Sequence, residues 1–141
     1  MRRPLASTVL AVLLLAAPLL AAPAAFAGTS PLTFSPSVVT FSHVPVDSTV
    51  QKAVTLTDTG SEPLTINGYE VFSEGPRFNG NFTLNPGSCT LFTALAPGES
   101  CTFAIVTSPP VAGPLHGRFC YTVIGATTYV RECGRIVGAA S

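Results

Sequence analysis

The residues of this sequence with the most obvious chemical potential are its four cysteines, Cys89, Cys101, Cys120 and Cys133. An even number of cysteines is typical of disulfide-bonded domains in oxidising compartments. Zinc is the alternative, but a four-cysteine zinc site usually contains two close C-x-x-C pairs, and the spacings here are 12, 19 and 13 positions. We therefore expect two disulfides, and of the three possible pairings we favour Cys89–Cys101 with Cys120–Cys133.

The pairing of Cys120 with Cys133 follows from the strands expected around these two residues. Residues 119–124 and 129–133 are rich in β-branched and aromatic side chains, which favour strands. If residues 125–128 form the turn between them, counting outward from the turn brings Cys120 opposite Cys133. Directly opposed residues of antiparallel strands are close enough for a disulfide.

Other side chains offer little catalytic chemistry. Glu70 and Glu74 are the candidate carboxylate pair of a small hydrolase, because glycoside hydrolysis needs two acidic groups at a set separation. His116 is the candidate base, but it and His43 stand outside any metal-binding motif. The sequence contains neither a G-x-S-x-G nucleophile motif nor a G-x-x-x-x-G-K-[ST] phosphate-binding loop. We expect no enzyme activity, no metal and no cofactor.

A long polar loop, residues 73–81, is the candidate binding surface. Arg77, Phe78 and Asn79 lie near its tip. Loops on rigid sandwiches often carry recognition, and arginine and aromatic residues are enriched in binding hot spots. In the alternative interpretation, which we favour, Phe78 folds back onto the core.

Residues 1–27 have the pattern of a secretory signal peptide. Two arginines precede an apolar run, and residues 25–27 read Ala-Phe-Ala, the A-x-A pattern of signal peptidase sites. Two prolines interrupt the apolar run, which argues against a membrane-spanning helix. We expect cleavage after Ala27, which leaves residues 28–141 as a single secreted domain without a transmembrane segment.

The expected mature domain carries little charge. It keeps five basic and seven acidic residues, and only 10% of the full chain is charged, against about a quarter in typical proteins. A nucleic-acid-binding protein needs a basic patch to hold phosphates. We therefore exclude nucleic acid as a partner.

The body of the chain is expected to be all-β. No window of 11 or more residues combines helical periodicity with helix caps, whereas short β-branched and aromatic runs recur between Gly, Pro and Asp. Seven to nine short antiparallel strands in about 110 residues match one immunoglobulin-like β-sandwich. The expected strands cover residues 32–34, 38–42, 49–58, 64–72, 81–84, 89–93, 100–107, 118–124 and 128–135. The expected core side chains are Phe34, Phe41, Val54, Leu56, Leu64, Ile66, Phe82, Phe103, Ile105, Tyr121 and Val123.

Two local irregularities are also expected. The alternation of apolar residues shifts by one position at Asn67-Gly68, which predicts a β-bulge. Residues 96–99 read Ala-Pro-Gly-Glu, which suits a type II turn with proline second and glycine third.

Several motifs resemble those of choice-of-anchor D domains, relatives of the abnormal-spindle/hydin and major-sperm-protein immunoglobulin-like domains. Residues 53–66 (AVTLTDTGSEPLTI) resemble the family's strand, N-x-G-x-x-P-L, strand hairpin. Cys89 and residues 95–105 (LAPGESCTFAI) resemble its C…L-x-P-G-x-S-C-x-h-x-V pattern, in which the two cysteines often pair. Residues 108–113 stand where the family has F-x-P-x-x-x-G. The resemblance implies a non-catalytic module at the cell surface or outside the cell.

The chain departs from these motifs at three places. Asp58 replaces the usual asparagine of the first hairpin, and Thr107 replaces the usual aromatic residue. The hairpin that carries Cys120 and Cys133 is an addition.

The sequence therefore predicts a secreted, non-catalytic immunoglobulin-like module with a structural or binding role. Its expected partner is another protein or the cell-wall polysaccharide. Two other functions are open, a secreted inhibitor or effector that acts through loop 73–81, and a small hydrolase that uses Glu70 and Glu74 or His116.

Overall fold

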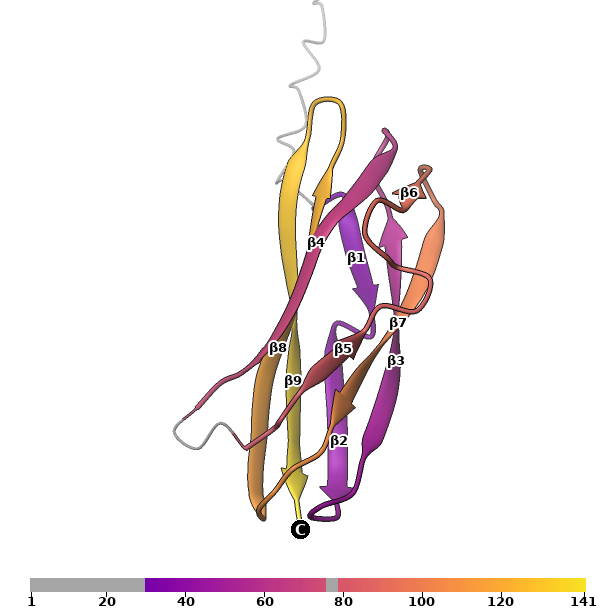
Figure 1. Cartoon of the computed structure of the whole chain (residues 1–141). Coiled ribbons are helices and arrows are strands. Elements are labelled where there is room, and N and C mark those ends of the chain that lie inside the picture. The colour runs from indigo at the N-terminus through magenta and orange to yellow at the C-terminus, as the bar shows by residue number, and fades with distance from the viewer. Residues whose placement is uncertain (1–29, 76–78) are drawn as a thin grey trace, which may run out of the picture.

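The computed structural model describes residues 30–75 and 79–141 (Figure 1). The predicted signal peptide, residues 1–27, and the predicted contact residues Arg77 and Phe78 lie outside the described residues. Within the described ranges the chain forms nine strands and no helix.

The strands form two sheets that pack face to face as an immunoglobulin-like sandwich, which confirms the predicted fold class. The first sheet contains, in spatial order, β1 (Leu32–Ser35), β3 (Val50–Asp58), β7 (Ser100–Thr107) and β5 (Thr83–Asn85). The second sheet contains, in spatial order, β2 (Val38–Val44), β9 (Tyr129–Ala140), β8 (Gly113–Ile124), β4 (Leu64–Ser73) and β6 (Ala94–Leu95). Neighbouring strands are antiparallel except β2 and β9, which are parallel.

The core lies between the sheets because apolar residues alternate with polar ones along the long strands. In β7, Cys101, Phe103 and Ile105 are buried while the residues between them are more exposed. The ring of Tyr121 on β8 lies 4.8 Å from the ring of Phe103, centroid to centroid. All eleven predicted core side chains are buried, each at most 9% exposed.

The chain crosses from the first sheet to the second at both lateral edges of the sandwich. At one edge β1 leads into β2, and at the opposite edge β5 leads into β6 (Figure 1). Both crossings join edge strands, where backbone groups are otherwise left without partners.

The two local irregularities are confirmed. The register between β4 and β8 shifts between Ile66 and Gly68, as expected for the bulge. In the turn before β7, the Glu99 N–H donates to the Ala96 carbonyl at 2.9 Å, and Gly98 has a φ of +83°. That positive φ is the conformation that a type II turn requires at its third residue.

Three strand predictions differ most from the structure. Residues 89–93 form a turn rather than a strand, and the short strand β6 follows at Ala94–Leu95. Strand β8 begins at Gly113, five residues before the predicted start. Strand β9 continues to Ala140 because β2 pairs with its second half.

Candidate binding site

Both predicted disulfides are present. Cys89 is bonded to Cys101 with a Cα–Cα distance of 5.3 Å, and Cys120 is bonded to Cys133 with a Cα–Cα distance of 4.1 Å. Cys120 lies directly opposite Cys133 in the register of β8 and β9, as the turn at residues 125–128 predicted. Disulfides of this kind form in oxidising environments such as the periplasm or the extracellular space.

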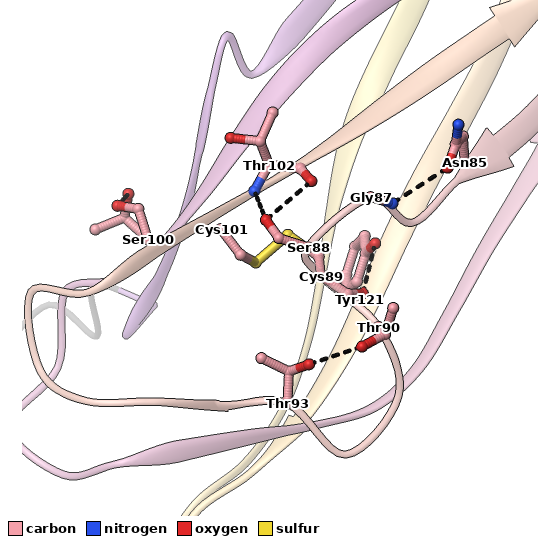
Figure 2. The surroundings of a disulfide bond; sticks show 11 residues. Asn85, Gly87, Ser88, Cys89, Thr90, Thr93, Ser100, Cys101, Thr102 and Tyr121 are labelled. Carbon is pink, nitrogen blue, oxygen red and sulfur yellow. Dashed lines mark hydrogen bonds between the residues drawn. A yellow bond between two sulfur atoms is a disulfide. The ribbon is translucent and has the colours of Figure 1, made fainter.

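The disulfide between Cys89 and Cys101 ties the crossing from β5 to β6 to the first sheet. We call residues 86–93 the stapled loop. The Ser88 N–H donates to the Thr102 carbonyl at 3.0 Å. The Thr102 N–H donates to the Ser88 hydroxyl oxygen at 2.9 Å (Figure 2). The stapled loop is therefore bonded to β7 both covalently and by hydrogen bonds.

The far end of the stapled loop is bonded to the second sheet. The Phe92 N–H donates to the Ile66 carbonyl at 2.8 Å, and the Ile66 N–H donates to the Thr93 carbonyl at 2.9 Å. Inside the sandwich the Tyr121 hydroxyl donates to the Cys89 carbonyl at 3.3 Å. Burial raises the pKa of Tyr121 above its ordinary value, so the hydroxyl keeps the proton that it donates. The loop is thus held by both sheets at once.

Leu91 and Phe92 project from this rigid loop into solvent. The side chain of Leu91 is 45% exposed and that of Phe92 is 77% exposed. Phe92 also has a φ of +67°, a left-handed conformation that costs an L-residue about 1–2 kcal/mol. Such a conformation persists only where the surrounding structure holds it, and it often marks functional positions. An exposed, rigidly presented aromatic residue is suited to an apolar contact with a partner.

Leu91 and Phe92 were not among the predicted site residues. The sequence carries one usable signal, since two large apolar residues stand between threonines inside a short segment bounded by cysteines. The β-branched and aromatic residues of this segment predicted a strand over residues 89–93, in which one of the two side chains would face the core.

The predicted binding loop, residues 73–81, is anchored at its described C-terminal end. The Asn79 side chain is buried, and its Nδ2 donates to the Val111 carbonyl at 2.8 Å. The Thr107 hydroxyl donates to the Gly80 carbonyl at 2.5 Å. Asn79 therefore attaches the loop to the connection between β7 and β8, and its amide is turned away from solvent.

The candidate catalytic residues are not assembled around a cavity. Glu70 forms an ion pair with Arg131 of β9, and the Glu74 carboxylate lies 3.2 Å from Nε of Arg118 of β8. These four side chains and His116 are all substantially exposed, and none of them lines the pocket found between β1 and β9. Each carboxylate is bound to an arginine rather than to the other carboxylate.

The described residues contain no group of three or more His, Cys, Asp or Glu side chains placed to hold a metal ion. Within the same residues no helix is long and apolar enough to cross a membrane.

Comparison with solved structures places the fold among several bacterial and eukaryotic domains. Vibrio cholerae VesB protease matches with a TM-score of 0.63 and 23% identity over 77% of this chain and 32% of that chain. The PapD-like domain 7 of human CEP192 matches with a TM-score of 0.61 and 12% identity over 98% of both chains. The periplasmic chaperone SfaE matches with a TM-score of 0.55 and 10% identity, over 78% of this chain and 57% of that chain. The chain thus corresponds to about a third of VesB, and at these identities the likeness concerns the fold.

No curated protein matches the chain in sequence. A sequence model of one family does match, and it covers residues 30–129, well over half of the chain. The match confirms the relationship to hydin-type immunoglobulin-like domains that the motifs of residues 53–66 indicated. The chain belongs to the HYDIN/CFA65/VesB-like family of immunoglobulin-like domains.

Proposed function

We propose that this protein is an exported, non-catalytic binding module that contacts a protein partner through Leu91 and Phe92. The observation that carries the proposal is the stapled loop, in which one disulfide and hydrogen bonds to both sheets hold two exposed apolar side chains. Fixing a loop before binding lowers the entropy lost on association. Aromatic side chains that insert into apolar pockets dominate many protein interfaces.

A non-catalytic role is supported by the distribution of polar groups. Glu70 and Glu74 are each bound to an arginine in an exposed position, which suits surface ion pairs better than acid–base chemistry. VesB is a protease, but this chain covers only 32% of it. We therefore assign no protease activity to this chain.

Export is supported by the sequence of residues 1–27 and by the two disulfides. Mass spectrometry of the protein made from the full sequence in a host with an export pathway tests this part. Cleavage between Ala27 and Gly28 is the expected result. Uncleaved, reduced protein that stays in the cytoplasm would refute export without affecting the assignment of the contact residues.

A photocrosslinking experiment tests the contact residues. A photoreactive phenylalanine analogue is placed at position 92, and at position 111 as a control, because Val111 is also an exposed apolar residue but lies between β7 and β8. The two proteins are exposed to the culture medium and envelope of the source organism. We expect a crosslinked partner protein from position 92 only. An excess of unlabelled wild-type protein should abolish this crosslink, whereas an excess of Leu91→Ser/Phe92→Ser protein should not.

Three results of this experiment would contradict the proposal. Equal crosslinking from both positions would show that the stapled loop is not selective. Crosslinks to polysaccharide would assign the alternative cell-wall ligand. The third result is that the Leu91→Ser/Phe92→Ser protein competes with crosslinking, whereas a competitor with glycine at residues 76–78 does not. That result would instead favour an effector acting through loop 73–81.

We also propose that, within its family, the chain belongs to the subgroup of choice-of-anchor D domains. The Leu95-Ala96-Pro97-Gly98 motif supports this narrower placement.

A further inference from the structure

A pocket of about 320 Å³ opens at the edge of the sandwich opposite the stapled loop, where β1 leads into β2. Leu32 and Phe34 of β1 form its apolar wall, and Glu132 and Cys133 of β9 lie across from them. The volume is at the lower end of the range for ligand pockets, which is enough for one long side chain. The pocket therefore combines an apolar wall with one carboxylate.

Glu132 lies on the core-facing side of β9. Its neighbours at alternate positions, Val130 and Gly134, face the same way and are partly or fully buried. Glu132 itself is half-buried, and no basic side chain of the described residues forms an ion pair with it. A half-buried carboxylate without a cation attracts a positively charged group more strongly than an exposed one does, because water screens it less.

The backbone beside this pocket is unpaired on one side. Strand β2 pairs only with Arg135–Ala140 of β9, so residues 129–134 have β8 on one side and no strand of the described chain on the other. The Arg135 N–H points to that side, where it donates to the Ser37 carbonyl at 3.0 Å. Because backbone groups alternate in direction along a strand, the N–H and C=O groups of Arg131 and Cys133 point to the open side too.

We propose that an extended peptide of another protein adds to the open edge of β9 at residues 129–134 and places a lysine or arginine side chain in the pocket. The added strand continues the line of β2 in the second sheet, and its alternate side chains face the pocket. The aliphatic stem of the basic residue packs on Leu32 and Phe34, and its charged end reaches Glu132. Backbone hydrogen bonds supply affinity, and the pocket supplies selectivity for a basic residue.

A second copy of this chain fits the edge less well. The core-facing residues of the same segment are Val130, Glu132 and Gly134, so a paired copy would bring no basic side chain to the pocket. Antiparallel self-pairing centred on Glu132 would place two carboxylates opposite each other, which is destabilising. The charge of the pocket therefore favours a different protein as the partner.

This inference goes beyond the proposed function. It concerns the opposite edge of the sandwich from the stapled loop, and nearly all of β9 lies beyond the residues matched by the family model, 30–129. The open edge of β9 can therefore bind a peptide whether or not the stapled loop binds a partner.

The test is a nuclear magnetic resonance titration of the protein made from its full sequence with a capped peptide, Ac-Thr-Val-Thr-Lys-Thr-Val-Thr-NH2. A second peptide carries glutamine in place of lysine. We expect the lysine peptide to shift the amide signals of Arg131 and Cys133 and to bind about tenfold more tightly than the glutamine peptide. Glu132→Gln should remove this tenfold preference and leave weak binding of both peptides.

Arg131→Pro and Arg131→Ala form a matched pair for the backbone contact. Both lose the ion pair with Glu70, but only proline removes the N–H that points to the open edge. We expect peptide binding to survive in Arg131→Ala and to be lost in Arg131→Pro. If Arg131→Pro does not fold, a lysine peptide methylated at alternate backbone nitrogens replaces it, and this peptide should not bind.

Several outcomes would overturn the inference. Absence of shifts at residues 129–134 at millimolar peptide would rule out strand addition at this edge. Equal binding of both peptides to wild-type protein would rule out the role of Glu132. A dimer in sedimentation that Arg131→Pro abolishes would assign the edge to a second copy of this chain instead.

Discussion

At the scale of one residue, a substitution at Phe92 should have opposite effects on stability and on partner binding, because the backbone of Phe92 is strained. An L-residue with a bulky side chain is strained at a φ of +67°, whereas asparagine tolerates that region. Because the Phe92 side chain is 77% exposed, its replacement removes little buried surface. Phe92→Asn should therefore raise the free energy of unfolding by about 1 kcal/mol. An excess of Phe92→Asn protein should also fail to compete with crosslinking from the photoreactive analogue at position 92.

Leu91→Asn is the control for this prediction, since Leu91 is exposed but has no positive φ. It should weaken partner binding without a gain in stability. Urea unfolding of the three proteins measures the effect, and a less stable Phe92→Asn protein would show that the loop conformation is unstrained.

The buried amide of Asn79 gives a second prediction at this scale. Asn79→Ala removes the hydrogen bond to the Val111 carbonyl and should cost about 1–2 kcal/mol of stability. Asn79→Asp should cost more at neutral pH, because it brings a buried carboxylate to face a carbonyl oxygen. Neither variant should change partner binding through Leu91 and Phe92. If either variant lost partner binding while its stability was unchanged, the binding site would lie in loop 73–81 instead.

At the scale of elements, the two disulfides have comparable effects on stability but different local roles. They close segments of similar length, with separations of 12 and 13 residues, so removal of either should cost about 3 kcal/mol. Cys89→Ala/Cys101→Ala also removes the covalent link between the stapled loop and β7 and leaves only the hydrogen bonds between Ser88 and Thr102 there. Cys120→Ala/Cys133→Ala leaves β8 and β9 paired along their whole length.

Hydrogen exchange under native conditions distinguishes these two effects. The amides of Phe92 and Ile66, which bond the stapled loop to β4, should exchange faster in the first double variant than in the second. Equal protection in both variants would mean that the hydrogen bonds alone hold the loop.

At the scale of the whole molecule, Glu62 links two turns at one end of the sandwich. Its carboxylate accepts hydrogen bonds from the Thr128 hydroxyl and, at 3.0 Å, from the Thr127 hydroxyl, although Glu62 lies between β3 and β4 and the threonines lie between β8 and β9. The hydrogen bond from Thr128 is the main reason that the pKa of Glu62 lies below its ordinary value of 4.5. The link therefore depends on the ionised carboxylate.

A lowered pKa in the folded state has a defined consequence for stability. The contribution of Glu62 is fully present above pH 4.5, its pKa in the unfolded chain, and is lost as the pH falls through the lower pKa of the folded protein. Glu62→Gln removes this titration, so its melting temperature should fall less than that of the wild type between about pH 5 and about pH 3. Parallel curves for the two proteins would contradict the linkage.

Much of the fold could be predicted because it depends on local patterns. The alternation in β7, the bulge at Asn67-Gly68 and the turn after Ala96 each follow from a few neighbouring residues. The disulfide between Cys120 and Cys133 followed from counting outward along one hairpin. Hydrophobic periodicity and turn chemistry act over short distances, so one sequence is enough to locate them.

The candidate sites could not be predicted in the same way, because each joins segments that are distant in the sequence. Phe92 is held in its strained conformation by Ile66, and Asn79 is buried by a bond to Val111. In both cases the deciding contact is a hydrogen bond to a residue on another element. From its apolar or polar character alone, the aromatic Phe92 would be expected to be buried and the polar Asn79 to be exposed. The structure shows the reverse.

The sequence by itself determined the all-β class, the core-facing side chains and the register of the last hairpin, since these follow from period-two alternation and local turns. Only the tertiary structure decided that β2 runs parallel to the second half of β9 and leaves the first half open. Pairing between strands so far apart in the chain depends on how two sheets close around one core, and no local pattern specifies it. That pairing creates the open edge and the pocket beside Glu132.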